Sequence, residues 1–227
     1  MLKLLVFLPL LGSIFSGLFP AILGRKGSIW IPTLFCFVSL IFSIILLKQA
    51  IGGESYIVHL GYWIKSESLT VSWALKLDML SAIMLFVVML VSSLVHLYSI
   101  GYMEHDEHKP RFFSYLSLFT FAMLMLVTSN NFLQLFFGWE GVGLCSYLLI
   151  GFWYKKPSAN AAAIKAFLVN RVGDFGFAIG IFLIFLFYGT INYDEVFQQT
   201  PLFTCLLYTS DAADEGLGVD LGGRRII

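Results

Sequence analysis

Residues 77–100 read LDMLSAIMLFVVMLVSSLVHLYSI, a run in which Asp78 is the only acidic residue and no lysine or arginine occurs. A helix rises about 1.5 Å per residue, so roughly 20 consecutive apolar residues cross the hydrocarbon core of a bilayer. The run therefore predicts a membrane-spanning helix. Runs of the same kind lie on both sides of it, at Leu4–Gly24, Ile29–Leu47, Phe112–Thr128, Phe132–Trp153 and Ile164–Tyr188.

The composition of the whole chain agrees with this prediction. Hydrophobic residues make up 59% of the 227 residues and charged residues 12%, whereas soluble domains carry about 25% charged residues. One water-soluble core cannot hide so much apolar surface, which excludes a soluble enzyme. The formal net charge of zero argues against nucleic acid as a partner, and the apolar composition favours a lipid bilayer as the surroundings. We expect an all-α membrane protein with about six transmembrane helices.

The longest connection between predicted spans is Lys48–Lys76, and it contains ESLTVSWALK at 67–76. The rough alternation of side chains in this decapeptide is typical of a short strand. We therefore expect a small extramembrane hairpin between the second and third helices. The other connections are short, which predicts that consecutive helices are antiparallel neighbours.

Basic residues cluster in alternate connections. The clusters are Arg25–Lys26, Lys109–Arg111 and Lys155–Lys156. Lysine and arginine mark the cytoplasmic or matrix side of a membrane protein, so we expect these three connections inside and the N-terminus outside. Lysines on the opposite side reduce the asymmetry; they are Lys3, Lys48, Lys65 and Lys76.

One acidic residue, Glu140, lies well inside the fifth predicted span, in the segment FFGWEGVGLCSY. A charge at mid-bilayer costs roughly 2.5–3.5 kcal/mol on insertion scales, so such a residue is a functional candidate. Burial and a neighbouring cation shift a carboxyl's proton affinity in opposite directions. Glu140 could therefore exchange a proton as its surroundings change, as a relay requires. The alternative is a carboxylate that only pairs with a basic side chain to fix helix packing.

The sixth predicted span carries three further charges. Arg171 and Asp174 are three residues apart, which puts them on one helix face where they can pair. An internal salt bridge and a transport role explain this pair equally well. Lys165 lies nearer the inner end of the same span, where it either extends its charge to the interface or contributes to the polar path.

Other polar residues suggest structural roles. We interpret His96 as an interfacial residue near a helix end and Asp78 as a residue favoured at a helix N-terminus. The run EHDEHK at 104–109 contains metal-ligating side chains but fits a solvated turn, so we predict no metal site. Cys36 and Cys145 lie in apolar runs and are expected to be buried thiols. Neither a phosphate-binding glycine loop nor an iron–sulfur cysteine cluster occurs in the sequence, so no site for NADH, flavin or haem is expected.

Two long motifs resemble a known family. They are GWEGVGLCSYLLIGFWY at 138–154 and AAAIKAFLVNRVGD at 161–174, and SLVHLYSIGYM at 93–103 and RFFSYL at 111–116 also match. They look like chain 5 of the proton-pumping NADH:quinone oxidoreductase, respiratory complex I, whose bacterial equivalent is subunit L. The resemblance runs from about Met1 to Phe203.

This resemblance implies an antiporter-like part of the complex I membrane arm, a subunit of an H⁺-translocating NADH:ubiquinone reductase. NADH, FMN, iron–sulfur clusters and quinone would be bound by other subunits, and the partners would be membrane-arm subunits, especially the adjacent antiporter-like one. The family's charged axis falls on Glu140, Arg171 and Asp174, with Lys165 as a further member. The membrane would be the bacterial plasma membrane or the mitochondrial inner membrane.

The resemblance leaves two points open. The family's central lysines and long lateral helix come later in its chains and have no counterpart here, so we do not expect this chain to pump alone. A subunit of a multi-subunit Na⁺/H⁺ antiporter shares the helix bundle and a Trp-Glu motif. The motifs quoted above favour complex I, and gene neighbourhood would separate the two.

The composition changes abruptly at Cys205. Residues 205–227, CLLYTSDAADEGLGVDLGGRRII, have neither a span nor a helical period and resemble a translated sequencing-library adapter. The alternative is a natural polar tail. We predict that 1–204 form the N-terminal part of an antiporter-like transmembrane domain, that 205–227 are an adapter-derived tail, and that the natural sequence is cut short near Thr204.

Overall fold

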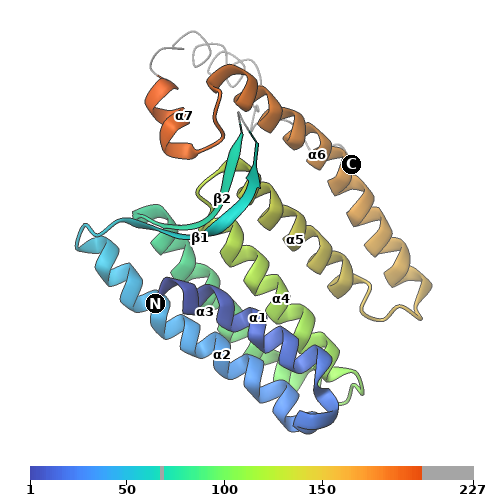
Figure 1. Cartoon of the computed structure of the whole chain (residues 1–227). Coiled ribbons are helices and arrows are strands. Elements are labelled where there is room, and N and C mark those ends of the chain that lie inside the picture. Colours follow the sequence, from blue (N-terminus) through green and yellow to red (C-terminus); the bar gives the residue numbers. More distant parts are fainter. Residues whose placement is uncertain (67–68, 201–227) are drawn as a thin grey trace, which may run out of the picture.

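The computed structural model describes residues 1–66 and 69–200 of the chain (Figure 1). The helices are α1 (Leu2–Leu18), α2 (Pro20–Ile51), α3 (Met79–Tyr102), α4 (Lys109–Val127), α5 (Phe132–Ile150), α6 (Pro157–Tyr188) and α7 (Tyr193–Gln199), and the strands are β1 (Tyr56–Lys65) and β2 (Thr70–Leu77). The helices from α2 to α6 are long and apolar enough to cross a membrane, and α1 is an apolar helix of 17 residues beside them. The expected multi-pass helical membrane protein is thus confirmed.

Successive long helices are antiparallel neighbours, as predicted. The α1–α4 part forms the packed body of the bundle, α5 lies against α4, and α6 lies at the edge beside α5 (Figure 1). The body is held by buried leucine and methionine side chains, among them Leu5, Leu46, Leu85, Met89 and Leu124. The charged residues of interest are on the two outer helices.

The first two helices begin and end differently from the predicted spans. We expected a break at residues 25–28, but α1 ends at Leu18 and α2 already begins at Pro20. Proline is favourable in a first helical turn because the N–H that it lacks has no intrahelical partner there. Within α2, Gly24 has φ 67°, which kinks the helix directly before the predicted connection at 25–28. Hydropathy alone did not distinguish a kink from a loop.

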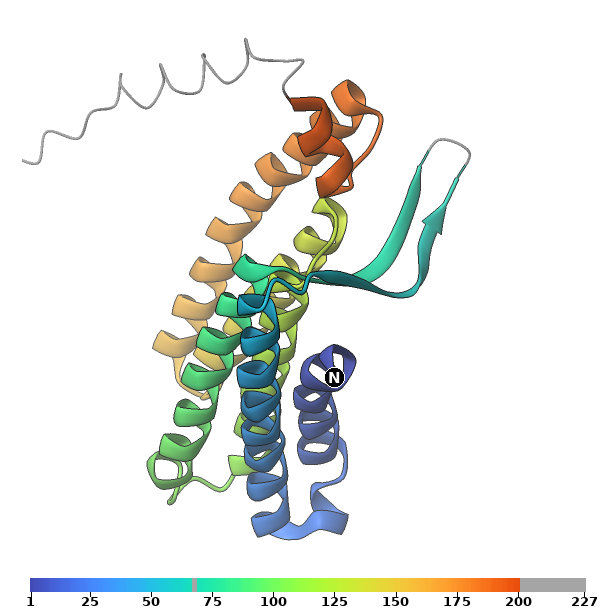
Figure 2. The same cartoon turned by 90° about the vertical axis from the view of Figure 1, so that its left-hand side faces the viewer.

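The predicted hairpin is present. Strands β1 and β2 pair antiparallel from Tyr56 opposite Leu77 to Lys65 opposite Thr70, and the hairpin projects beside the bundle (Figure 2). Trp63 stacks on Trp73 with ring centroids 4.7 Å apart, and Phe137 of α5 meets Trp73 edge-on. These aromatic contacts fasten the hairpin to α5.

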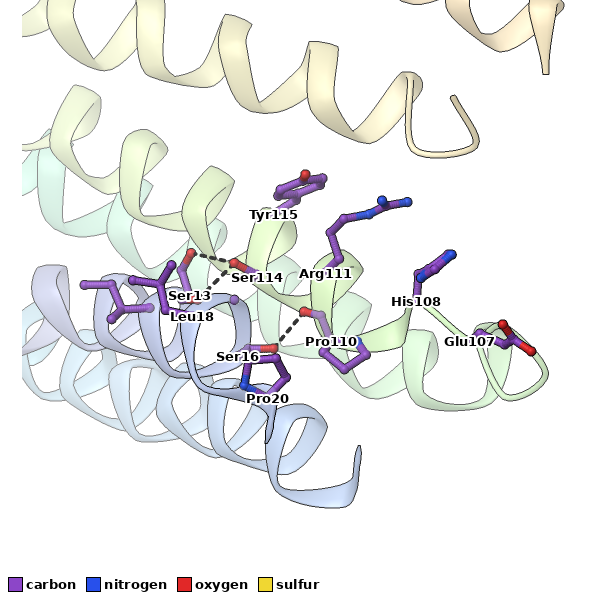
Figure 3. Close-up of a pocket in the computed structure, with 12 residues that line it drawn as sticks. Ser13, Ser16, Leu18, Pro20, Glu107, His108, Pro110, Arg111, Ser114 and Tyr115 are labelled. Atoms are coloured by element: carbon purple, nitrogen blue, oxygen red, sulfur yellow. Dashed lines mark hydrogen bonds between the residues drawn. The ribbon is translucent and has the colours of Figure 1, made fainter. Parts of the chain in front are cut away.

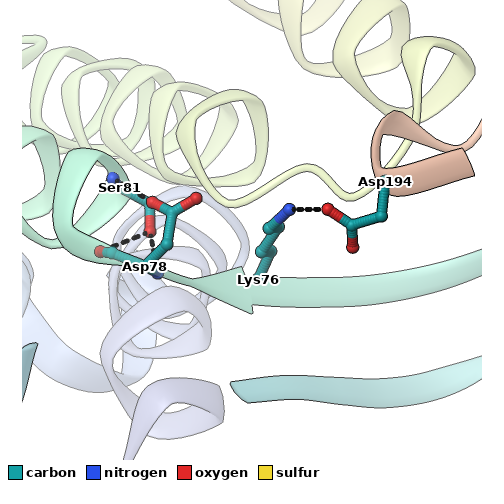
Figure 4. Close-up of polar contacts among 4 residues, drawn as sticks. All are labelled: Lys76, Asp78, Ser81 and Asp194. Atoms are coloured by element: carbon teal, nitrogen blue, oxygen red, sulfur yellow. Dashed lines mark hydrogen bonds and ion pairs between the residues drawn. The ribbon is translucent and has the colours of Figure 1, made fainter. Parts of the chain in front are cut away.

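Asp78 and Ser81 form a capping box at the start of α3. The Ser81 N–H donates to Asp78 Oδ1 and the Asp78 N–H donates to Ser81 Oγ, both at 2.8 Å. This satisfies helix-terminal N–H groups and confirms the interpretation of Asp78. Next to it, Lys76 pairs with Asp194 of α7 at 2.5 Å, so the hairpin also contacts the end of the described chain (Figure 4).

The interpretation of His96 as an interfacial residue was wrong. Its side chain is fully buried between helices. Nδ1 lies 2.8 Å from the backbone oxygen of Ser92, so it carries the proton and donates, and Nε2 lies 3.0 Å from Ser117 Oγ on α4. The position of His96 near the end of the helix suggested the membrane boundary. However, α3 is rotated so that the face carrying His96 packs against α2 and α4. Cys36, a buried thiol as expected, lies 3.6 Å from the same ring.

The three basic clusters of the sequence lie together at one end of the bundle, although Arg25 and Lys26 are part of α2. Arg25 donates to the backbone oxygen of Asp106 at 2.9 Å, and the Trp153 indole N–H donates to the Asp106 carboxylate at 3.0 Å. Arg111 donates to the Phe152 backbone oxygen at 3.0 Å. The hairpin and α7 lie at the opposite end. The assignment of the basic end to the inner side stays a prediction.

The predicted domain boundary at residue 204 and the tail 205–227 lie outside the described residues.

Candidate functional site

Charged residues of the predicted spans meet at the interface of α5 and α6. The guanidinium of Arg171 on α6 pairs through Nη1 with Oε2 of Glu140 on α5. The same nitrogen lies 3.7 Å from Oδ2 of Asp174, one turn further along α6. One cation therefore stands between two carboxylates. We call Glu140, Arg171 and Asp174 the charge cluster.

Glycines explain why Glu140 faces α6. A Cβ atom added to Gly138 would lie 2.6 Å from the Cα of Leu126, and one added to Gly141 would lie 3.0 Å from the Cβ of Ala122. These two glycines therefore form the face of α5 that touches α4. Residue 140 is two positions after 138, about 200° around the helix, and so points away from α4. Gly143, on the same helix, has open space around it.

The cluster is unevenly buried in the described chain. The side chain of Asp174 is 11% exposed, whereas the side chains of Glu140 and Arg171 are 20% and 41% exposed. The Arg171 guanidinium carbon also lies 4.6 Å above the ring of Phe167, one turn earlier on α6, a cation–π contact that favours a weakly hydrated guanidinium. In the part of the chain that the structure describes, Oε1 of Glu140 is buried and has no hydrogen-bond partner.

Trp139 is a member of the site that the sequence reasoning missed. Its indole Nε1–H donates to Asp174 Oδ1 at 2.8 Å, so Asp174 is bonded across the interface as well as facing Arg171. An indole N–H in an apolar span needs a partner, because no water competes for it there. The sequence does contain a tryptophan directly before an acid in a predicted span. That position does not identify the residue that accepts the indole hydrogen bond.

Lys165 is not brought into the cluster. It lies six residues before Arg171 on α6, about 9 Å along the helix axis, and its side chain is exposed. No hydrogen bond or ion pair of Lys165 occurs among the described residues. Its participation in the charged axis stays a prediction.

A groove of about 480 Å³ runs beside the cluster. Asp174, Asn170 and Gly173 of α6 line it together with Trp139 and Leu135 of α5. The lining of this groove is mainly apolar, and Asp174 and Asn170 are polar residues in it.

A second cavity, of about 580 Å³, lies at the basic end between α1 and the start of α4 (Figure 3). Its serine hydroxyls are hydrogen-bonded within the protein: Ser114 Oγ donates to the Ser13 backbone oxygen at 2.9 Å, and Ser16 Oγ to the Pro110 backbone oxygen at 2.8 Å. The run 104–109 borders this cavity as a turn in which Asp106 accepts the His108 N–H at 2.7 Å. No group of three metal-ligating side chains gathers in 1–66 or 69–200. The charge cluster is therefore the stronger functional candidate.

Comparisons with known proteins identify the family to which the chain is similar. Residues 63–113 match the family model of the NADH-ubiquinone oxidoreductase (complex I) chain 5 N-terminus. Residues 129–212, which include the whole cluster, match the transmembrane model of NADH:quinone oxidoreductase and the Mrp antiporter. The second match crosses the boundary predicted at residue 204.

Individual relatives are similar over most of the chain. NADH-quinone oxidoreductase subunit L of Rhodobacter capsulatus is 53% identical over 208 residues, 88% of this chain and 29% of the relative. NADH-ubiquinone oxidoreductase chain 5 of Chondrus crispus is 52% identical over 204 residues, 89% of this chain and 31% of the relative. The chain thus spans about 30% of the length of these curated relatives.

Solved structures share the fold. The Mrp complex from Dietzia sp. DQ12-45-1b matches with a TM-score of 0.73 at 22% identity, over 86% of this chain and 20% of that chain. The archaeal membrane-bound sulfane sulfur reductase matches with a TM-score of 0.74 at 19% identity, over 86% and 39%. The fold is therefore that of antiporter-like bundles, and the complex I relatives have the higher sequence identities. This chain belongs to the family of the NADH-quinone oxidoreductase subunits L and NADH-ubiquinone oxidoreductase chains 5.

Proposed function

We propose that this chain is part of a proton-translocating membrane-arm subunit of NADH:quinone oxidoreductase, which couples NADH oxidation and quinone reduction to proton pumping. The supporting observation is that one guanidinium, Arg171, faces two carboxylates, Glu140 and Asp174, within helices long enough to span a membrane. NADH, FMN, the iron–sulfur clusters and quinone belong to other subunits. The adjacent antiporter-like subunit is the expected neighbour, in a bacterial plasma membrane or mitochondrial inner membrane.

The cluster performs this function by exchanging ion-pair partners. Arginine does not lose its proton in proteins, so Arg171 is a fixed positive charge. While Arg171 pairs with Glu140, the opposite charges of the two side chains compensate each other. When Arg171 moves toward Asp174, Glu140 is left in a poorly solvated site and takes up a proton. The return of Arg171 expels that proton. A small movement of α6 along α5 is sufficient, because the same nitrogen already lies 3.7 Å from Asp174.

The full-length protein assembled into its complex tests this proposal. Glu140→Gln keeps the shape of the side chain and one acceptor oxygen but removes the titratable carboxyl group. We expect NADH-driven proton uptake into membrane vesicles to fall strongly, with the amount of assembled complex unchanged. Lys65→Ala, in the exposed hairpin, is the control and should leave uptake at the level of the unmodified complex. Full coupling in Glu140→Gln would remove Glu140 from the pump.

Asp174→Asn tests the second carboxylate. It should disturb pumping or assembly more than Lys65→Ala, because Arg171 then has one anionic partner in place of two. Equal effects of the two substitutions would show that Asp174 has no part in the exchange.

A multi-subunit Na⁺/H⁺ antiporter remains the second candidate, supported by the fold shared with the Mrp complex. Genes for complex I subunits beside this gene would support the first proposal, and genes for antiporter subunits the second.

A further inference from the structure

Asp174 uses its two oxygens differently. Oδ1 accepts the Trp139 indole N–H at 2.8 Å, a normal hydrogen-bond length. Oδ2 lies 3.7 Å from Arg171 Nη1, which is too long for a hydrogen bond. The neutral donor is therefore the closer partner of Asp174, and the cation is the more distant one.

Glu140 has the opposite arrangement. Oε2 pairs directly with Arg171, while Oε1 is buried with no hydrogen-bond partner among the described residues. Two carboxylates thus compete for one guanidinium, and the one with no other donor holds it. Trp139 is the group that gives Asp174 its other donor, and it adds no charge to the cluster.

Extending the function proposed above, we propose that Trp139 is a positioning residue that decides which carboxylate holds Arg171. By donating to Asp174 across the α5–α6 interface, its indole N–H weakens the attraction of Asp174 for Arg171 and leaves the guanidinium with Glu140. Trp139 directly precedes Glu140 in the chain, so any rotation of α5 moves the donor and the competing carboxylate together. Loosening the Trp139–Asp174 bond would release Arg171 from Glu140.

Trp139 also has a packing role, which must be separated from the bond. Its ring meets Phe177 of α6 edge-on with centroids 6.1 Å apart, and it lines the groove beside Asp174. Replacing Trp139 by 3-benzothienylalanine keeps the size and shape of the ring and exchanges the N–H for sulfur. The change therefore removes the donor and keeps the packing.

The chain contains a matched control. Trp153 also donates its indole N–H to a carboxylate, that of Asp106, at 3.0 Å, but in the connection at the basic end. The same replacement at Trp153 removes the same type of bond outside the charge cluster. Both replacements are made in the full-length protein within the assembled complex, and NADH-driven proton uptake is normalised to the amount of complex.

We expect the replacement at Trp139 to lower proton uptake roughly tenfold, the size expected for losing one hydrogen bond to a charged group, and the replacement at Trp153 to have no effect. The effect should vanish in an Asp174→Asn background, because asparagine has no charge with which to attract Arg171. A pure packing role predicts the same loss in both backgrounds, and that result would overturn the proposal. An unchanged rate in the Trp139 variant would also overturn it.

Glu140→Gln, measured in parallel, keeps the two proposals distinct. A loss in Glu140→Gln without a loss in the Trp139 variant refutes the role of Trp139 and leaves the exchange mechanism standing. Full activity in Glu140→Gln refutes the exchange mechanism itself.

Discussion

Gly138→Ala adds a single methyl group to the contact that places Glu140. That Cβ would lie 2.6–2.7 Å from the Cα, Cβ and N atoms of Leu126. Ordinary contacts of this kind begin near 3.4 Å, so α4 and α5 must separate by about 0.8 Å. Two of the three atoms are backbone and cannot rotate away. Overpacking of this kind costs about 1–3 kcal/mol, and this site lies at the upper end of that range. Alanine stabilises a helix by about 1 kcal/mol relative to glycine, which offsets part of this cost. The net cost is about 2 kcal/mol.

Gly143→Ala is the matched control on the same helix. A Cβ at Gly143 meets nothing within 4 Å, so only the gain in helix propensity of about 1 kcal/mol remains. The two identical substitutions should therefore differ by about 3 kcal/mol in the free energy of unfolding. Titration of the purified chain in mild detergent with a denaturing detergent, followed by circular dichroism, measures this difference.

Equal unfolding free energies for the two variants would refute the argument that Gly138 forms the α4–α5 contact. The same result would remove the reason given for the orientation of Glu140 toward α6.

The remaining predictions concern other parts of the chain. His96→Leu should lower the free energy of unfolding by about 1–3 kcal/mol because Ser117 loses its partner, whereas His105→Leu in the exposed turn should change it by about 0.5 kcal/mol or less; similar values for both would contradict the buried hydrogen bonds of His96. At Asp106, desolvation raises the carboxyl pKa, but the His108 N–H, the Trp153 N–H and the nearby His108 and Arg111 cations outweigh it and lower the pKa overall. Its contribution to stability is therefore complete above the ordinary pKa of 3.8 and is lost as the pH falls through the lower folded value, and Asp106→Asn should remove that part of the acid unfolding curve. Resequencing the gene should return further apolar helices in place of residues 205–227, and recovery of the same tail from independent genomic DNA would show the tail to be natural.

Much of the fold could be predicted because hydropathy and helix geometry act locally. Asp78 was recognisable as a helix-starting residue from its position before an apolar run, and the spacing of Arg171 and Asp174 predicted their common face. The alternation at 67–76 predicted β2. Each of these inferences needs one element only.

Features that depend on the rotation of one helix against another could not be predicted. His96 lies near the end of α3 in the sequence, but it is buried because its face of α3 turns toward Ser117. The Trp139–Asp174 bond requires one particular register of α5 against α6. Sequence spacing within one helix contains no information about such a register.

The central claim is that Glu140 changes its protonation as the pump works. Infrared difference spectroscopy of the complex containing the full-length protein, recorded with and without NADH, measures it most directly. Exchange of the Arg171 partner predicts a carboxylic acid band that forms during turnover, shifts in D₂O and is missing in Glu140→Gln. An identical difference spectrum from the unmodified complex and Glu140→Gln would contradict the claim.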